Sequence, residues 1–374
     1  MTSLASENSP KRPQYYPILD LVRFIAALLI IFIHIFPEGS TTSSIGLDSS
    51  IPTLLGVSLV HALLRPAVPV FFLISSFLLF RKIELDPENK WKHVGSFCLR
   101  LLYLYLFWYV LGLPLTIKDI VGYASQGDTY NIIRYVVITL WKGAPRGYWF
   151  LVSLASCSAL VALAKSKKSL TIMTVVAGIL FAYGCLNAAY FGVFSLSDDP
   201  VSKALLTIGN YMELSYCFLE ALLFVCLGKI FALHGPFKIK GNIVFIVLSF
   251  LLMIGELFLT LYFRLFVYPD AYFLLPVFVF FLMNQIFSIN IESESFARVA
   301  RKLKKVGSFS YLFHIQFFAY MHWVLDATGH NVFREQIALL LIPYFVCVGL
   351  AFLLQTLFER LSKFKYLGFF RYSY

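Results

Sequence analysis

The chain has 374 residues, of which 59% are hydrophobic and only 14% are charged, and its mean hydropathy is +0.78. Soluble domains contain roughly 45–50% apolar and about 25% charged residues, so this composition excludes an ordinary soluble protein and indicates a membrane protein with several spans. The net charge of +11 does not indicate a nucleic-acid partner, because the basic residues lie in short loops between apolar runs. Loops at a membrane surface typically have this character.

The first predicted element is a membrane span that carries charge. The run LDLVRFIAALLIIFIHIF extends from Leu19 to Phe36 and contains Asp20, Arg23 and His34. Arg23 and His34 are eleven positions apart, so a helix places them on nearly the same face, about 16 Å apart along its axis. Asp20 lies one turn before Arg23, and we expect it to pair with the guanidinium. Ionisable groups inside a bilayer are costly, so they are normally functional or firmly paired.

Ten apolar runs of spanning length follow one another along the chain. They are residues 17–36, 66–80, 95–114, 147–164, 169–187, 211–231, 242–262, 267–288, 306–325 and 336–357. Residues 51–64 precede the second run and are either an interfacial helix or an extension of that span. The sequence therefore predicts an all-α polytopic membrane protein with ten transmembrane helices. Its predicted parts are an N-terminal tail at 1–15, a membrane domain at 16–357 and a C-terminal tail at 358–374.

The distribution of basic residues predicts the orientation. Most of the 31 Lys and Arg residues fall in the tails and in every second loop, on one side of the predicted membrane. Basic loops remain on the cytoplasmic side, so we expect both termini in the cytoplasm. The expected location is the cytoplasmic membrane of a bacterium.

The longest predicted outer segment is 116–147, between the third and fourth spans. It includes DTYNIIRYVVITLWKG, whose apolar spacing suits a helix that lies in the interface or tucks back into the protein. The six cysteines lie in apolar segments and lack the spacing of metal ligands. No metal site is therefore predicted.

Two arginines are predicted at similar depth from the cytoplasmic side. Arg23 in the first span and Arg100 in the third each lie about 9 Å inside the membrane. The cytoplasmic half of the second span adds Ser75, Ser76 and Arg81. One interpretation is a cationic funnel for a phosphate-bearing ligand, because guanidinium binds phosphate bidentately and keeps its charge. In the other, Arg23 pairs with Asp20 and Arg100 extends to the interface.

Two histidines and two glutamates also lie inside predicted spans. His34 is near the outer side and His314 is near mid-membrane, and histidine is the usual general base near neutral pH. His34 lies on the same helix face as Arg23, which favours a functional role for it. His314 is equally well a hydrogen-bonded core residue. For Glu220 and Glu256 three roles stay open: orienting a histidine, carrying protons in a transporter, or pairing with a polar neighbour.

Five segments in order along the chain carry a family resemblance. They are the first span with its Arg-x10-His spacing, VPVFFLISSFLLFRK, FCLRLLYLY, YWFLVSLASCSAL and GSFSYLFHIQ. Together they resemble the acyltransferase 3 family of integral-membrane O-acyltransferases, over residues 16 to about 357. Two departures stand out. The family's third span usually has two arginines three apart, where this chain has Arg100 and Tyr103, and the family's Ser-Gly pair in span two is Ser75-Ser76 here.

The resemblance implies transfer of an acyl group, usually acetyl from cytoplasmic acetyl-CoA, to a hydroxyl of a cell-surface glycan or lipid-linked sugar. The CoA-binding residues are then expected to be Arg23, Arg100, Ser75, Ser76 and Arg81. His34 is the expected general base, and Arg23 assists catalysis. The acceptor is expected to contact Tyr148, Trp149, His314 and Glu220, although Tyr148 and Trp149 also suit an aromatic belt at the membrane surface.

Two other classes of protein fit the same composition. A transporter or flippase of a lipid-linked sugar or acyl compound also needs polar stripes and intramembrane carboxylates, and it depends more on Glu220 or Glu256 than on His34. A lipid-binding or sensing module carries out no chemistry and has no affinity for CoA. The expected partners are acyl-CoA, the acceptor and membrane lipids, with no nucleic acid.

Overall fold

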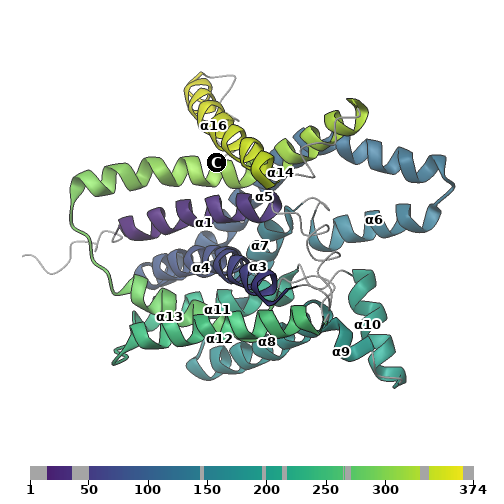
Figure 1. Cartoon of the computed structure of the whole chain (residues 1–374). Helices are drawn as coiled ribbons and strands as arrows, with labels where there is room; N and C mark the ends of the chain where they lie inside the picture. Colours follow the sequence, from purple (N-terminus) through teal and green to yellow (C-terminus); the bar gives the residue numbers. More distant parts are fainter. Residues whose placement is uncertain are drawn as a thin grey trace, which may run out of the picture.

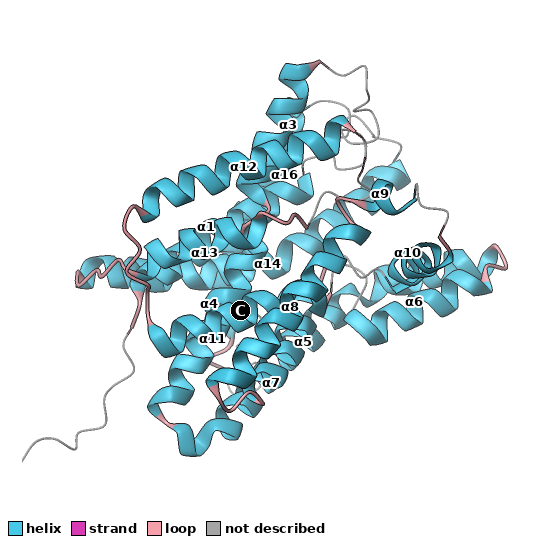
Figure 2. Ribbon diagram, turned by 90° about the horizontal axis from the view of Figure 1, so that it is seen from below, coloured by secondary structure: helices cyan, strands magenta, loops and turns pink. Residues whose placement is uncertain are grey.

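The described part of the chain is helical. In the computed structural model, the described residues are 15–35, 50–143, 147–195, 199–212, 217–263, 265, 271–328 and 337–364, and they contain no strand (Figures 1 and 2). The all-α prediction is confirmed. Residues 1–14 and 365–374, which make up most of the two predicted tails, lie outside the described residues.

Each of the ten predicted runs overlaps a different one of ten helices. These helices are α1 (Pro17–Ile35), α4 (Ala67–Leu85), α5 (Lys90–Ser125), α7 (Trp149–Ala162), α8 (Lys167–Asn187), α11 (Phe218–His234), α12 (Asn242–Tyr262), α13 (Leu275–Phe287), α14 (Glu294–Thr328) and α16 (Ile337–Leu361). Six helical segments in the described ranges are long and apolar enough to cross a membrane, and α7 and α13 are shorter apolar helices. The chain is therefore a polytopic membrane protein.

The remaining helices connect or extend these spans. They are α3 (Ile51–Leu64), η1 (Pro87–Asn89), α6 (Thr129–Lys142), α9 (Phe191–Ser195) and α10 (Pro200–Met212). Residues 51–64 extend the second span, because α3 leads into α4 through a turn at Arg65 and Pro66. The helix predicted near residues 128–143 is confirmed as α6, which folds back beside α5 (Figure 1).

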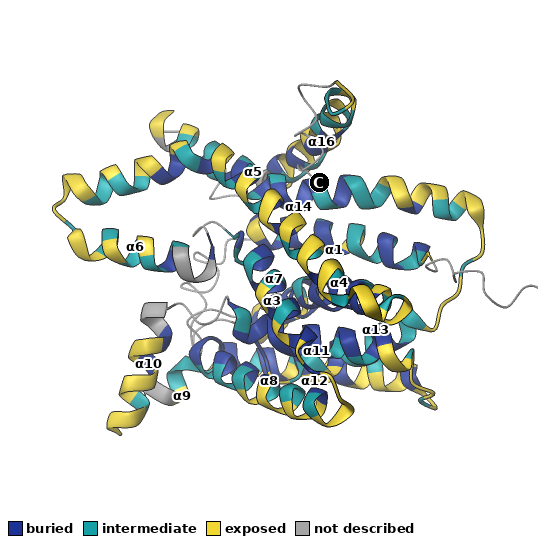
Figure 3. Ribbon diagram, turned by 180° about the vertical axis from the view of Figure 1, so that it is seen from behind, coloured by how far each residue is buried: buried dark blue, intermediate teal, exposed yellow. Residues whose placement is uncertain are grey.

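The helices differ in how much of their surface other helices cover. α4 lies at the centre of the bundle, and its residues from Val70 to Phe77 are all buried. α5, α8, α12 and α16 lie at the periphery and expose large apolar side chains, as Figure 3 shows. On α12, for example, Ile243 and Val244 are 65% and 66% exposed. Such extended apolar faces are stable only against lipid, which fits the membrane architecture.

Two small residues allow α4 and α11 to pack closely. A Cβ atom added at Gly228 of α11 would meet the Ser76 hydroxyl of α4, and would lie 2.6 Å from the Leu73 carbonyl oxygen. The Ser76 hydroxyl itself donates to the carbonyls of Phe72 and Leu73 in its own helix. Small residues at a helix interface let two backbones approach closely, which is the usual basis of helix association inside a membrane.

α1 and α14 run side by side in the same direction (Figure 1). A Cβ atom added at Gly307 of α14 would lie 3.0 Å from the Cα atom of Phe24 on α1, so the two backbones are close there. Near the N-terminus of α1 the two helices are joined by an ion pair of 3.4 Å between Lys304 Nζ and Asp20 Oδ1. We call this end of the bundle, which also carries Lys82, the basic end.

Substituting Gly228 tests the contact between α4 and α11. Gly228→Ala should lower the thermal unfolding temperature of the purified protein, because the new methyl group meets backbone atoms that cannot move away easily; overpacking costs about 1–3 kcal/mol. Gly178→Ala on α8 is the matched control, since no atom lies within 4 Å of its added Cβ atom. Alanine is a better helix former than glycine, so the control should unfold at the same or a higher temperature. Equal unfolding temperatures for the two variants would contradict the close contact.

Candidate active site

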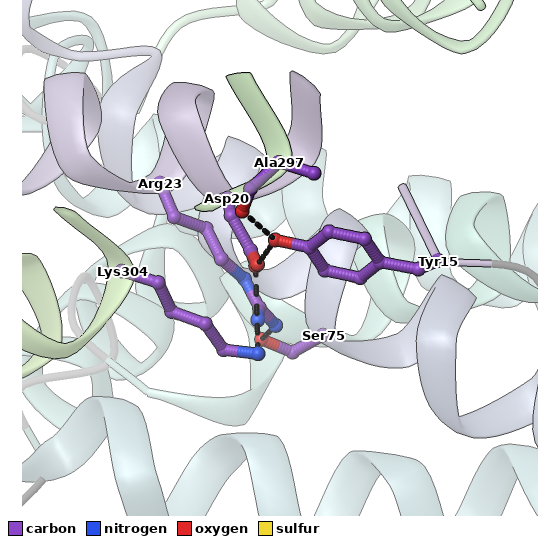
Figure 4. Close-up of polar contacts among 6 residues, drawn as sticks. All are labelled: Tyr15, Asp20, Arg23, Ser75, Ala297 and Lys304. Carbon is purple, nitrogen blue, oxygen red and sulfur yellow. Dashed lines mark hydrogen bonds and ion pairs between the residues drawn. The ribbon is translucent and has the colours of Figure 1, made fainter. Parts of the chain in front are cut away.

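A buried carboxylate organises the basic end of α1. Asp20 is only 2% exposed and accepts a hydrogen bond of 2.8 Å from the Tyr15 hydroxyl in addition to its ion pair with Lys304 (Figure 4). Burial, and then the hydrogen bond to Asp20, raise the pKa of Tyr15, so its hydroxyl stays protonated and can donate. The predicted ion pair between Asp20 and Arg23 is wrong: in the described part of the chain, the carboxylate bonds to Tyr15 and Lys304 instead.

Arg23 reaches from α1 to α4. Its Nη2 atom donates to the Ser75 hydroxyl at 3.0 Å (Figure 4). A guanidinium has five N–H donors, and the buried Nε atom of Arg23 has no partner among the described residues. Arg23 therefore has donors available for a further ligand.

Arg23 and Ser75 line a cavity of about 420 Å³ at the basic end, bounded by α1, α4, α5, α7 and α14. Its basic lining residues are Arg23, Lys82, His93, Arg100 and Lys304. No carboxylate lines the cavity among the described residues. The lining is therefore strongly cationic, and an anion with several oxygen acceptors is the ligand that suits it.

The structure brings together three of the five predicted phosphate-binding residues, Arg23, Arg100 and Ser75. Arg81 points elsewhere and donates to the Ala232 carbonyl of α11 at 3.4 Å. Ser76 faces α11 as well. The proposed roles of Arg81 and Ser76 in this cavity are therefore corrected, because adjacent positions on a helix differ by about 100° in direction.

Sequence reasoning missed Lys82, His93 and Lys304. Helical spacing could have found the first two, since Lys82 is seven residues beyond Ser75 and His93 seven before Arg100. Seven residues are about two turns, so each pair shares a face. At the cavity mouth, Asp86 Oδ2 bonds to His93 Nε2 at 2.8 Å. Hydrogen bonds from Asn89 and then His93 lower the pKa of Asp86, so it remains a carboxylate that holds the imidazole.

The two intramembrane histidines lie against each other. The ring centroids of His34 on α1 and His314 on α14 are 5.0 Å apart. His314 is fully buried, and its Nδ1 atom lies 3.3 Å from the Ser310 carbonyl oxygen. A carbonyl only accepts, so Nδ1 carries the proton and Nε2 carries the lone pair. Nε2 has no hydrogen-bond partner among the described residues, while His34 is exposed. The pair thus offers basic nitrogen within the membrane region.

A layer of aromatic rings separates the cationic cavity from the histidine pair. Tyr311 lies 5.3 Å from Phe71 and 5.3 Å from Phe150, measured between ring centroids, and all three residues line the cavity. The other neighbour of Tyr311 is His314, 5.8 Å away. One side chain therefore separates the cavity from a histidine.

Tyr148 and Trp149 belong to the core of the bundle. Tyr148 is 1% exposed; its hydroxyl donates to the Leu312 carbonyl at 3.5 Å and accepts a bond of 2.8 Å from Gln316 Nε2. Trp149 packs against Phe72. A buried ring cannot stack on a sugar, so the predicted contact of Tyr148 with the acceptor is wrong. The aromatic-belt alternative does not apply to Tyr148 either.

The two intramembrane glutamates differ in their surroundings. Glu256 on α12 accepts hydrogen bonds from the Tyr190 hydroxyl at 2.6 Å and from the backbone N–H groups of Phe273 and Leu274 at 2.7 and 2.9 Å. It thereby holds the segment that leads into α13, so of its three open roles the structure favours pairing with polar neighbours. Glu220 is 7% exposed, lies in the first turn of α11 and does not line the cationic cavity.

Comparison with known proteins identifies the family. The acyltransferase domain that defines the acyltransferase 3 family matches residues 16–358, nearly the whole chain. The chain belongs to the acyltransferase 3 family. The resemblance seen in the sequence is thus confirmed over the range on which it rested.

Curated relatives of this acyltransferase include two proteins of Enterococcus faecalis, each named amino-acid racemase. One is 24% identical over 275 residues and the other 26% identical over 272, covering 71% and 72% of this chain. The matches cover 36% and 35% of those proteins, so the chain spans about a third of the length of the relatives it matches. No solved structure matches the chain.

Proposed function

We propose that this membrane acyltransferase moves an acetyl group from cytoplasmic acetyl-CoA to a hydroxyl of a cell-surface glycan or lipid-linked sugar. The observation that carries the proposal is the short path between two groups of residues. A cationic cavity and a histidine pair lie on opposite sides of one aromatic layer. Acyl transfer from CoA needs both an anion site for the donor and a base for the acceptor.

The cationic cavity suits the phosphates of CoA. Arg23 and Arg100 are guanidinium groups, which bind phosphate oxygens bidentately and stay charged when desolvated. Lys82 and Lys304 add charge at the mouth. With the basic end in the cytoplasm, as the loop charges predict, the donor enters from the side where acetyl-CoA is made. The thin pantetheine arm then passes the aromatic layer once Tyr311 moves away from Phe71 and Phe150.

The histidine pair supplies the base. His34 accepts the proton of the acceptor hydroxyl as its oxygen attacks the thioester carbonyl, and the C–S bond then breaks to release the CoA thiolate. The proton passes from His34 to the thiolate, which leaves as the thiol. His314, close to His34, contributes an unprotonated Nε2 to the same pocket. Arg23, about 16 Å along α1 from His34, assists the reaction by holding the phosphates of the donor in the cavity rather than by contacting the thioester oxygen.

A transporter remains the second candidate. The observation in its favour is the match to much longer proteins named amino-acid racemase, because a membrane domain joined to a racemase could move that enzyme's substrate or product across the membrane. Such a transporter needs no CoA, so it predicts that CoA does not stabilise the purified protein.

Two adjacent residues of α4, one lining the cavity and one facing α11, test donor binding. Lys82→Ala should raise the KM for acetyl-CoA about tenfold or more, because a charge-assisted bond to phosphate contributes about 1.5–3 kcal/mol. Arg81→Ala removes the same charge from the neighbouring position but faces α11, so its KM should stay near that of wild type. The measurement is a steady-state titration with acetyl-CoA at saturating acceptor. A larger effect in Arg81→Ala would contradict the assignment of the cavity.

Loss of the proposed base tests the chemistry. Membranes that contain the protein should incorporate labelled acetyl from acetyl-CoA into glycan or lipid fractions, and His34→Ala should reduce incorporation about 10²- to 10⁴-fold. His234→Ala, at the end of α11, is the control and should keep wild-type incorporation at matched expression. If wild type incorporates no label and CoA does not stabilise the purified protein, the transporter becomes the better account.

A further inference from the structure

A second, apolar groove lies on the periphery of the bundle, between α5, α14 and α16. Its volume is about 650 Å³, within the usual range for ligand pockets of roughly 300–1,000 Å³. The walls include Trp108 and Leu111 of α5, Phe313 and Phe317 of α14, and Leu354 of α16. A groove of this composition facing lipid suits a hydrocarbon chain.

The polar side chains in the groove turn their polar atoms into the protein. Tyr320 donates its hydroxyl to the Leu111 carbonyl at 2.8 Å, and Gln316 Nε2 donates to the Trp108 carbonyl at 3.1 Å. Along α14 the lining runs from Phe309 to Leu325, about 24 Å, which is most of the roughly 30 Å thickness of a hydrocarbon core. An extended chain can therefore lie along the whole groove.

A cation lies near the end of the groove that is opposite the basic end. Lys118 Nζ lies 5.1 Å from the ring centroid of Trp323, and Trp323 lies 6.1 Å from the ring of Tyr320, which lines the groove. Lys118 is exposed and makes no ion pair with a described residue. A lysine and two aromatic rings at the membrane surface suit a phosphate followed by a sugar.

The groove shares a wall with the candidate active site. Gln316, in the groove, bonds to the Tyr148 hydroxyl, and Tyr148 bonds to the carbonyl of Leu312, which lines the cationic cavity. α14 thus presents Phe313 and Phe317 to the groove, and Tyr311 and Leu312 to the cavity. A ligand in the groove lies one helix away from the proposed donor.

We propose that this groove binds the hydrocarbon chain of a lipid-linked sugar phosphate, with the phosphate on Lys118 and the sugar beside Trp323 and Tyr320. The inference rests on the proposed function, of which it names the acceptor class: the acetylated hydroxyl belongs to a sugar that arrives on a lipid phosphate. The chain in the groove anchors that lipid beside α14, on the side from which the acceptor approaches.

The test measures binding by the full-length protein in detergent, by native mass spectrometry. The probe is farnesyl phosphate, with farnesol and phosphatidylglycerol as comparisons. Val324→Trp fills the groove and should weaken farnesyl phosphate binding about tenfold, the equivalent of about 1.4 kcal/mol. Val175→Trp on α8 is the matched control, since Val175 and Val324 are each 59% exposed, and it should bind as wild type does. Lys118→Gln should weaken farnesyl phosphate several-fold and leave farnesol unchanged.

Two results would overturn the proposal. In one, Val324→Trp and Val175→Trp bind farnesyl phosphate equally. In the other, phosphatidylglycerol binds as well as farnesyl phosphate and Lys118→Gln affects neither, which would make the groove part of the general lipid surface. The assay contains no acetyl donor, so its outcome is independent of whether the protein transfers acetyl groups. Labelled acetyl transfer from acetyl-CoA by membranes that contain the wild-type protein then tests the proposed function separately.

Discussion

The buried carboxylate of Asp20 is the interaction on which the arrangement of the site depends. It joins α1 to α14 through Lys304 and holds Tyr15 at the start of α1. A buried charge is tolerated only when it is paired and hydrogen-bonded, so this contact fixes the register of the two helices. With the two helices held parallel, His34 in the last turn of α1 lies opposite His314 in the middle of α14. Because Asp20 bonds to Tyr15 and Lys304, the side chain of Arg23 extends instead to Ser75 and the cavity.

Three faces of α14 lie in three different environments. One face contributes Lys304 and Tyr311 to the cationic cavity, a second carries His314 toward α1, and a third lines the apolar groove with Phe313 and Phe317. Because these faces are separate, a charged donor, a base and a lipid chain can bind around one helix while each stays in its own polar or apolar environment. This arrangement also explains why so polar a helix belongs in a membrane protein: its exposed cations Arg298, Arg301 and Lys302 lie in its first three turns, whereas His314, further along, is buried.

The sequence predicted the structure correctly where the membrane requires long runs of apolar residues. A span needs about 20 apolar residues, so hydropathy located the membrane helices, and the predicted depth of Arg23, Arg100 and Ser75 correctly grouped them in one cavity. The predictions were wrong where the partner of a side chain lies on a helix that is distant in sequence. Asp20 was assigned to the nearest cation in sequence, whereas Lys304, 284 residues away, is its ionic partner. Arg81 was assigned to the cavity by its depth alone, although its side chain points to α11 and the next residue, Lys82, lines the cavity. The burial of Tyr148 depends on Gln316, which no local pattern predicts.

A structure of the protein with a non-hydrolysable thioether analogue of acetyl-CoA, determined by electron cryomicroscopy, would test the central claim most directly. The account predicts that the phosphates contact Arg23 and Arg100, that Tyr311 has moved away from Phe71 and Phe150, and that the acetyl carbon lies next to His34. Phosphates bound outside the cationic cavity, or an acetyl group remote from both histidines, would contradict it.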